Sequence, residues 1–350
     1  MENRNAYVCI MAGGSGERFW PMSRKALPKH LLKLFSDRTL VEEAVRRLED
    51  VVPHENVFVL TNQAQLEATR AALSFLPPAQ IIAEPAKRDT AAAAALATAL
   101  VRARDANAVM ALLPADSLIK NQAVYARQLN AALARAANSD ALLTFAIKPS
   151  YPATGFGYLE MAEDLGDGFR RVARFVEKPD EATAKQYLAG GNHAWNAGMF
   201  VWKVESFLAE ATKHTPMLAQ FIREFPANDA SDYLAKKFPT LEPKVSVDYA
   251  IMEKAAAVET LVAEFDWDDV GTWTALPAHL PQDKSGNTIR GKVLTVDSTN
   301  NVAVSNGRVI ALCGVKDLVV VETGDAILVC HRDAVQQIKQ LMPDLPDEVC

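Results

Sequence analysis

The feature that most constrains the fold is an alternation, over the first half of the chain, of short apolar runs and longer helical patterns. The short runs are rich in β-branched residues and indicate buried strands at residues 7–12, 57–61, 108–113 and 142–147. Helical periodicity lies between them, at residues 40–48, 90–104 and 124–137. Strands separated by helices commonly pair in parallel and are covered on both faces. The expected fold class is therefore α/β, with a mostly parallel central sheet and helices on both faces.

The remainder of the chain follows two other patterns. Further strands are expected at residues 156–160, 172–177 and 198–202, and a helix is expected at 180–188, closed by Gly190 and Gly191. After a linker at 276–287, short strands recur at residues 293–296, 302–304, 309–312, 318–321 and 326–329. This spacing predicts a small C-terminal all-β module, for which a short β-helix is one arrangement that fits, and a terminal helix near 334–341. The expected domains are residues 1–280 and 281–350.

Composition excludes several classes of protein. The 350 residues carry a formal net charge of -6, which argues against wholesale binding of nucleic acid or of an acidic membrane. The four cysteines, at positions 9, 313, 330 and 350, lack the spacing of zinc sites and of a disulfide framework. The N-terminal apolar run is too short for a signal peptide, and no stretch approaches the ~18 apolar residues of a membrane span. A reduced, cytoplasmic setting is the expectation.

A glycine-rich loop follows the first expected strand. Residues 11–24 read M-A-G-G-S-G-E-R-F-W-P-M-S-R, and Pro28 and Lys29 follow shortly. Glycines at this place let the backbone approach a phosphate and offer it N–H groups, and Arg18 and Lys29 supply positive charge. The loop is neither the dinucleotide fingerprint nor a P-loop. The alternative is a tight turn with solvated basic residues, and the combination of features favours a phosphate-handling loop.

Two acidic positions are candidates for holding a divalent cation. Asp116 follows the expected strand 108–113, and ligands of such sheets bind beyond the C-terminal strand ends. On position alone, a helix N-cap or a turn is the simpler interpretation of Asp116. Asp268 and Asp269 are adjacent in the run W-D-D-V-G, and adjacent acids share an enclosed site only when a cation compensates them. Their alternative is an exposed acidic turn.

Together with the glycine loop, seven further blocks make the chain resemble the sugar nucleotidyltransferases. The blocks are E-P-A-K-R-D-T-A at 84–91, L-P-A-D at 113–116, T-G-F-G-Y at 154–158, F-V-E-K-P at 175–179, W-N-A-G-M-F at 195–200, V-D-Y-A-I-M-E-K at 247–254 and W-D-D-V-G-T-W at 267–273. They follow the family's order over nearly the whole chain. The F-W-P-M-S-R continuation of the loop resembles the mannose-1-phosphate guanylyltransferase branch in particular. The resemblance implies a Rossmann-like nucleotidyltransferase fold.

The resemblance also implies roles for individual residues. The residues that act on the phosphates would be Arg18, Lys29 and Lys178, and those that bind the nucleotide would be Gly13, Gly14, Ser15, Gly16, Glu84 and Thr90. The residues near the sugar would be Gly157, Glu177 and Asn196, and the ligands of Mg²⁺ would be Asp116 and Asp269, with Asp268 as the alternate. Glu84 could accept hydrogen bonds from N1–H and N2–H₂ of guanine, since only guanine offers that pair. Independently of any such role, Asp89 or Thr90 is the expected N-cap of the following helix.

The implied reaction joins the guanylyl group of GTP to mannose 1-phosphate and releases pyrophosphate and GDP-mannose. The sequence leaves open whether the chain forms a homo-oligomer. Two alternatives remain, namely a nucleotidyltransferase for another sugar 1-phosphate or nucleotide, and a non-catalytic paralogue that binds nucleotide-sugar. The chain departs from the usual family residues at His30, Asp89, Ser117, Ala153 and Ala197. These departures put the identity of the sugar and of the base in doubt more than the chemistry, because they leave the phosphate and metal positions intact.

Overall fold

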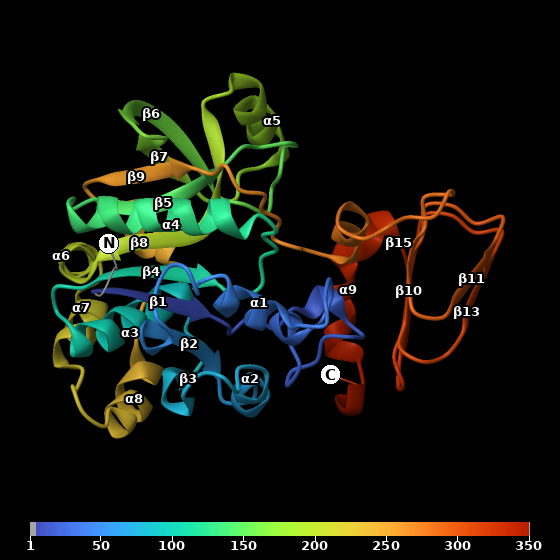
Figure 1. Cartoon of the computed structure of the whole chain (residues 1–350), viewed down its shortest axis with the longest axis horizontal. Helices are drawn as coiled ribbons and strands as arrows, with labels where there is room; N and C mark the ends of the chain where they lie inside the picture. Colours follow the sequence, from blue (N-terminus) through green and yellow to red (C-terminus); the bar gives the residue numbers. More distant parts are fainter. Residues whose placement is uncertain (1–4, 350) are drawn as a thin grey trace.

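The computed structural model describes residues 5–349, and its centre is a nine-stranded sheet (Figure 1). The strands are ordered β3-β2-β1-β4-β8-β5-β9-β7-β6. Their bounds are β1 Ala6–Met11, β2 Val57–Asn62, β3 Ile81–Glu84, β4 Val109–Pro114, β5 Leu142–Ile147, β6 Tyr158–Gly166, β7 Phe169–Val176, β8 His193–Lys203 and β9 Val258–Val262. The strands expected in the first half of the chain correspond to β1, β2, β4 and β5, which are buried apolar runs as predicted.

The sheet is parallel in its first half and mixed in its second. Strands β1 to β4 pair in parallel, and β9 pairs in parallel with β5. Strands β7 and β8 run against the others, so β8 separates β4 from β5 by two antiparallel ladders. The C-terminal ends of β1, β3 and β4 consequently meet at one edge of the sheet, where ligands of parallel sheets bind.

Helices cover both faces of the sheet, as the alternating pattern predicts (Figure 1). One face packs against α1 Leu40–Arg46, α2 Leu66–Ala72 and α4 Gln122–Ala137. The other face packs against α3 Asp89–Arg104, α6 Val204–His214, α7 Pro216–Glu224 and α8 Ser231–Lys237. Helix α3 presents a run of buried alanines that lets it approach the sheet closely. The α/β fold class is thus confirmed.

Helix α5, Glu181–Gly190, begins and ends where its sequence signals predict. Asp180 is the N-cap, because its side chain accepts a hydrogen bond from the backbone N–H of Thr183 at 2.8 Å. Gly191 follows the helix with a φ of 72°, the left-handed conformation that terminates many helices. The helix follows directly on Glu177 and Lys178, and its N-cap therefore fixes the direction in which that segment leaves the sheet.

The C-terminal region forms a small coil of parallel strands, so the expected all-β module is confirmed. Its strands are β10 Thr288–Arg290, β11 Val293–Val296, β12 Val302–Ser305, β13 Ile310–Cys313, β14 Leu318–Glu322 and β15 Ile327–His331. Strands β10, β12 and β14 stack in parallel, and β11 stacks in parallel on β13. Strand β15 pairs antiparallel with β14 and closes the coil. Alternate strands therefore belong to two stacked sheets, which is the arrangement of a short β-helix. The terminal helix α9 spans Ile338–Leu341.

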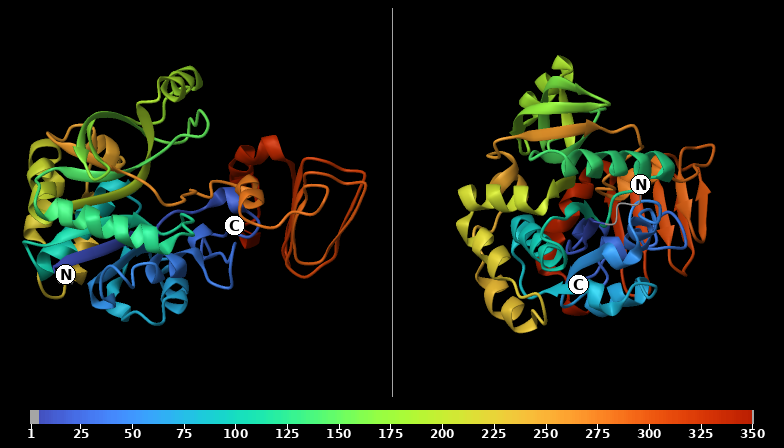
Figure 2. Two further views of the ribbon diagram at one scale, coloured as in Figure 1. Left: turned by 45° about the horizontal axis from the view of Figure 1, so that its top comes forward. Right: turned by 60° about the vertical axis from the view of Figure 1, so that its left-hand side comes forward.

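The module packs against the loop that follows β1. In Figures 1 and 2 the orange and red module extends to one side of the sheet, with α9 beside the dark blue loops. A common apolar core joins Phe19 and Trp20 of the loop to Val319 and Ile338 of the module. The indole of Trp273 donates a hydrogen bond to the backbone oxygen of Trp20 at 3.2 Å. The loop is therefore held from both sides, while the division into domains at residue 280 stays a prediction.

Two expectations from composition concern membranes and cysteines. Within residues 5–349, no helix has both the length and the apolar character that a membrane crossing requires. Cys9, Cys313 and Cys330 are free thiols, and burial raises the pKa of Cys9 far above its usual range. Cys350 lies outside the described residues.

Candidate active site

A pocket of about 580 Å³ opens at the C-terminal ends of β1, β3 and β4. Seven of the residues expected to bind nucleotide, phosphate or metal line it, namely Gly13, Gly14, Gly16, Lys29, Glu84, Thr90 and Asp116. Met11, Leu60 and Ala93 add apolar wall. An apolar pocket with a few charged groups at its ends is the usual form of a small-molecule site. The structure thus gathers residues that are up to 103 positions apart in the chain, from Gly13 to Asp116.

Gly16 fixes the glycine loop against Lys29. Its φ of 63° lies in the left-handed region, and a Cβ built there would lie 2.5 Å from Cβ and 2.6 Å from the backbone N of Lys29. Only a residue without a side chain permits this approach. No atom lies within 4 Å of the position that a Cβ would take at Gly14, so its backbone faces open space in the pocket. Ser15 lies outside the pocket lining, and its hydroxyl donates to Glu17 Oε1 at 3.2 Å.

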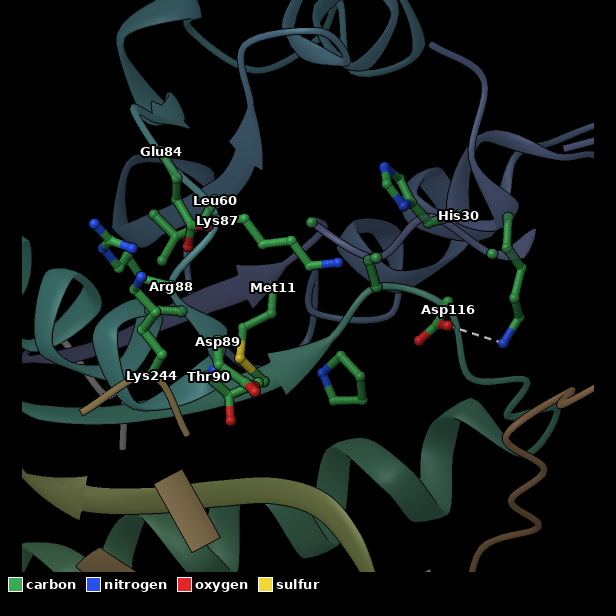
Figure 3. A pocket seen from close by; sticks show the side chains of 17 residues that line it. Met11, His30, Leu60, Glu84, Lys87, Arg88, Asp89, Thr90, Asp116 and Lys244 are labelled. Carbon is green, nitrogen blue, oxygen red and sulfur yellow. Dashed lines mark hydrogen bonds and ion pairs between the residues drawn. The ribbon is translucent and has the colours of Figure 1, made fainter. Parts of the chain in front are cut away.

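Lys29 joins the two segments that carry the predicted metal ligands. The side chain is buried, and its Nζ donates to Asp116 Oδ2 at 2.9 Å and also to the backbone oxygen of Asp269. A dashed line marks the ion pair at Asp116 in Figure 3. Leu118 and Asp268 form an antiparallel bridge through two backbone hydrogen bonds, of 2.9 and 3.1 Å. This bridge brings Asp116 and Asp269 to the same side of the site despite their distance in sequence.

The neighbours of Asp268 distinguish it from Asp269. Its Oδ1 accepts from the backbone N–H of Val270 at 2.6 Å, and its Oδ2 lies 2.6 Å from Nε2 of His279. Both oxygens of Asp268 are thus engaged by the protein. The carboxylate of Asp269 instead interacts electrostatically with Lys29, Arg18 and Asp116. The geometry favours Asp269 over the alternate Asp268 as the carboxylate that faces the site.

The two site carboxylates differ in their charge balance. Burial opposes ionisation of Asp116, but the ammonium of Lys29 outweighs it and holds the pKa of that carboxyl below its usual range. For Asp269, burial is the largest influence, and together with the charges of Asp268 and Asp116 it raises the pKa. The pKa of Asp269 thus stays raised although the charges of Lys29 and Arg18 oppose the rise, while Asp116 is paired with Lys29.

Arg18 lies at the module side of the site and outside the pocket lining. It belongs to the 3₁₀ turn Glu17–Phe19, and its Nη1 lies 3.5 Å from Oε1 of Gln336 in the C-terminal module. The same nitrogen would be 3.6 Å from a Cβ at Gly271. Burial raises the pKa of Asp269, and the charge of Arg18 partly opposes that rise. The guanidinium of Arg18 therefore lies between Gln336 of the C-terminal module and the segment that carries Asp269.

Glu84 lies at the opposite end of the pocket from Asp116 (Figure 3). It is the last residue of β3, and burial raises the pKa of its carboxyl to about 7. The Oε2 atom would be 3.8 Å from a Cβ at Gly13, so the carboxylate faces the glycine loop. A partly buried carboxyl with a raised pKa in a pocket is a candidate for contact with a ligand.

The start of α3 differs from the expectation of an N-cap at Asp89 or Thr90. Arg88 occupies the N-cap position and makes no side-chain cap. The hydroxyl of Thr90 accepts instead from the backbone N–H of Val247 at 2.9 Å, and Asp89 has a φ of 66° and binds the N–H of Thr90. The N-cap prediction was wrong because a distant segment, 245–247, takes the hydroxyl. That segment also places Lys244, which no sequence motif singled out, in the pocket wall.

The residues expected near the sugar form a second group beside the pocket. Glu177 is nearly buried and forms an ion pair with Lys178, whose φ is 45°. Burial opposes the charge of Lys178, but Glu177 outweighs it and raises the pKa of the lysine. A Cβ at Gly157 would lie 2.6 Å from Glu177 Oε2, so any larger residue there would force the carboxylate of Glu177 to move. The backbone oxygen of Gly157 accepts from the N–H of Asn196 at 2.8 Å.

Asn196 links this second group to Asp248, a carboxylate to which the sequence assigned no role. The Nδ2 atom of Asn196 donates to Asp248 Oδ1 at 3.0 Å, and its Oδ1 accepts from Thr144 at 2.7 Å. Asp248 adjoins Val247, which contacts Thr90 of the nucleotide pocket. Segment 245–248 therefore connects the two groups. The block V-D-Y-A-I-M-E-K could have indicated Asp248, because this acid stands directly before a run of apolar residues that is buried.

Comparisons with known proteins show which families the two parts of the chain match. Residues 7–285 match the family model described as nucleotidyl transferase. Residues 291–345 match the model described as a MannoseP isomerase/GMP-like beta-helix domain. The first match contains all the predicted site residues, and the second falls on the coil of parallel strands.

Curated relatives and a solved structure extend over nearly the whole chain. A mannose-1-phosphate guanylyltransferase of Escherichia coli is 36% identical over 339 residues, which are 95% of this chain and 72% of the relative. The alginate biosynthesis protein AlgA of Pseudomonas aeruginosa is 37% identical over 352 residues, covering 96% of this chain and 71% of the relative. A structure described as mannose-1-phosphate geranyltransferase from Thermus thermophilus aligns with a TM-score of 0.89 and 31% identity, over 97% of this chain and 99% of that one.

Proposed function

Since this chain belongs to the nucleotidyl transferase family and is an enzyme of it, we propose that it transfers the guanylyl group of GTP to α-D-mannose 1-phosphate. The products are GDP-mannose and pyrophosphate. We expect the reaction to take place in the cytoplasm. The main support for the proposal is that the pocket has different charged groups at its two ends. Lys29 and Asp116 lie at one end of the pocket, where Lys29 also contacts the backbone oxygen of Asp269, and Glu84 lies at the other end.

The residues of the chain have separate tasks in this reaction. Glycine-loop N–H groups and Lys29 hold the triphosphate, and Arg18 adds charge where the leaving pyrophosphate develops its own. Lys178 holds the phosphate of the sugar so that one of its oxygens attacks the α-phosphorus in line. Glu177 and Asn196 bind hydroxyls of the sugar, and Gly157 allows the backbone to pass close to it. No covalent intermediate with the enzyme is needed.

The donor set of Asp116 and Asp269 suits Mg²⁺. Within residues 5–349 no group of three or more His, Cys, Asp or Glu residues could enclose a metal by itself. Mg²⁺ commonly uses one or two carboxylates together with substrate phosphate oxygens and water. The ammonium of Lys29 already lies beside Asp116, which indicates that this place attracts positive charge. When bound, the ion would neutralise charge on the triphosphate.

The proposed function is tested by the choice of substrates. Pyrophosphate release should be measured over a grid of nucleoside triphosphates and sugar 1-phosphates. GTP with mannose 1-phosphate is expected to give the highest kcat/KM. Preference for dTTP or UTP with glucose 1-phosphate would contradict the proposed substrates and leave the reaction class intact. Absence of turnover with every pair, together with binding of nucleotide-sugar, would favour a non-catalytic paralogue.

Glu84 gives a prediction about the base and about pH. If the ionised carboxylate accepts from N1–H and N2–H₂ of guanine, Glu84→Gln turns one acceptor into a donor that faces a donor. Such a mismatch costs roughly 1–3 kcal/mol, so the preference for GTP over ATP is expected to fall about 10- to 100-fold. The control is Glu67→Gln, an exposed change on α2. Unchanged discrimination would show that another group reads the base.

The pH dependence follows from the raised pKa of about 7. Below that pH the free protein holds Glu84 protonated, and binding of guanine must remove the proton. The KM for GTP is therefore expected to rise as pH falls below 7, by about tenfold for each further unit. In Glu84→Gln this component should be absent. Steady-state kinetics at several pH values, with mannose 1-phosphate saturating, measure both effects.

A further inference from the structure

Asp248 occupies a rigid place beside the sugar residues. It is the first residue of the π-helical turn Asp248–Met252, in which Ala250, Ile251 and Met252 are buried in the core below the sheet. Its carboxylate meets Nδ2 of Asn196 at 3.0 Å. Three apolar side chains thus anchor the turn, and the carboxylate of Asp248 points toward the side-chain amide of Asn196 in β8.

The neighbours of Asn196 fix the orientation of its amide. Oδ1 accepts from the hydroxyl of Thr144 at 2.7 Å and from the backbone N–H of Gly198 at 3.3 Å. A backbone N–H can only donate, so this side of the amide must be the oxygen. The NH₂ group then faces Asp248. Among the described residues, Asp248 is the one acceptor that the amide nitrogen meets, which leaves one N–H of Asn196 for a ligand.

We propose that Asp248 is the positioning residue of the sugar site, because it holds the Asn196 amide so that its remaining N–H donates to a hydroxyl of the sugar 1-phosphate. The inference rests on the proposed function, since it concerns the second substrate of that reaction. It also means that Asn196 donates to the sugar and does not accept a hydrogen bond from it. The amide oxygen is already used by Thr144 and Gly198.

The charges around Asp248 make its role sensitive to pH. Burial and, next, the nearby carboxylate of Glu177 together raise the pKa of its carboxyl to about 6. Hydrogen bonds from its own backbone and from Ser246, and the charge of Lys178, limit the rise. Tyr249 and Glu253 are the remaining titratable groups of the same segment, and Glu253 also senses Glu177. An ionised acceptor forms a stronger hydrogen bond than a neutral one. Protonation of Asp248 therefore weakens its hold on Asn196.

The test compares KM values for the two substrates. In Asp248→Ala the KM for mannose 1-phosphate is expected to rise by about 10- to 100-fold, while the KM for GTP changes less than about twofold. Asp248→Asn keeps an acceptor of the same shape but no charge, so a smaller rise of about three- to tenfold is expected. The wild-type KM for the sugar should rise as pH falls below about 6, and Asp248→Asn should lack that dependence. Asp232→Asn, an exposed change on α8, is the matched control.

A double-mutant cycle with Asn196→Ala separates positioning from a structural role. If Asp248 acts through Asn196, then Asp248→Ala adds little to the sugar KM once the amide is gone. Additive effects of the two changes, or equal rises in the KM for GTP and for the sugar, would overturn the inference. If Asp248→Ala does not fold, Asp248→Asn and the wild-type pH profile decide. If the wild type prefers another sugar 1-phosphate, the proposed substrate fails, and the same cycle measured with that sugar still tests Asp248.

Discussion

Asp269→Asn is expected to lower turnover by roughly 10²–10³, the scale of one lost contact to the transition state, and to leave the fold at least as stable. The carboxylate of Asp269 faces Asp116 across the site, and burial and these charges raise its pKa. A carboxyl whose pKa is raised in the folded state is costly to ionise there, so stability is lost as pH rises above its ordinary pKa. The neutral asparagine removes that cost at neutral pH while it removes the charge of one of the two proposed ligands of Mg²⁺.

Asp116→Asn is expected to lower turnover by the same roughly 10²–10³ but to destabilise the protein. Its pKa is held low by the ammonium of Lys29, so the ion pair contributes stability above the ordinary pKa of an aspartate and loses it in acid. The amide oxygen of the asparagine can still accept from the buried Lys29, as the backbone oxygen of Asp269 does, but it supplies no charge to balance the ammonium. A cost of about 1–3 kcal/mol follows for the free energy of unfolding.

Pyrophosphate release at saturating substrates, with a titration of Mg²⁺, and thermal unfolding measure both variants. Asp268→Asn is the informative comparison, because His279 and Val270 already engage that side chain. It is expected to lose stability and to keep more activity than Asp269→Asn. If both Asp116→Asn and Asp269→Asn kept near-normal activity with Mg²⁺, the assignment would be wrong and Asp268 would be the next candidate.

Gly16→Ala is expected to abolish most activity, by at least about 10², and to lower the free energy of unfolding by roughly 2–4 kcal/mol. The new Cβ would lie 2.6 Å from the backbone N of Lys29, and a φ of 63° is itself unfavourable for alanine. A flexible side chain could move away from such an overlap, but a backbone atom cannot. The change therefore displaces Lys29, which joins Asp116 to Asp269.

Gly14→Ala is the matched control for Gly16→Ala. No atom lies within 4 Å of its Cβ position, so the melting temperature is expected to stay within about 2 °C of wild type. Because Gly14 lines the pocket, a methyl group there should still hinder a phosphate and raise the KM for GTP. Equal melting temperatures and equal activities for the two variants would show that the contact with Lys29 does not hold the loop in place.

The first half of the fold could be predicted because its strands are buried on both faces. Such strands read as continuous apolar runs, as β2 and β5 do, and their order along the chain suggests a parallel sheet. The positions of β7 and β8 were predicted, but their reversed direction was not. The direction of a strand depends on the strands with which it pairs. Strand β8 pairs with β4, whose residues are about 90 positions earlier in the chain, so no local pattern indicates its direction.

The family resemblance was confirmed, and the structure gathers most of the residues that it implied. Contacts between distant segments could not be predicted. The hydroxyl of Thr90 binds Val247, so the local N-cap signal was misleading. Asp248 acquires its neighbour Asn196 only through the folded sheet. The choice between Asp268 and Asp269 likewise depended on His279, which lies 11 residues from Asp268 and gave no local signal.

The proposed reaction moves the guanylyl group of GTP, with its α-phosphorus, to mannose 1-phosphate. Following labelled phosphorus distinguishes this reaction from transfer of the γ-phosphoryl group and from hydrolysis of GTP. The enzyme should be incubated with mannose 1-phosphate, Mg²⁺ and GTP labelled either at the α- or at the γ-phosphorus, and the products separated. The label from the α-position is expected in GDP-mannose, and the label from the γ-position in pyrophosphate. Transfer of the γ-label to a sugar phosphate, or its release as inorganic phosphate with the α-label left in GDP, would contradict the proposed reaction.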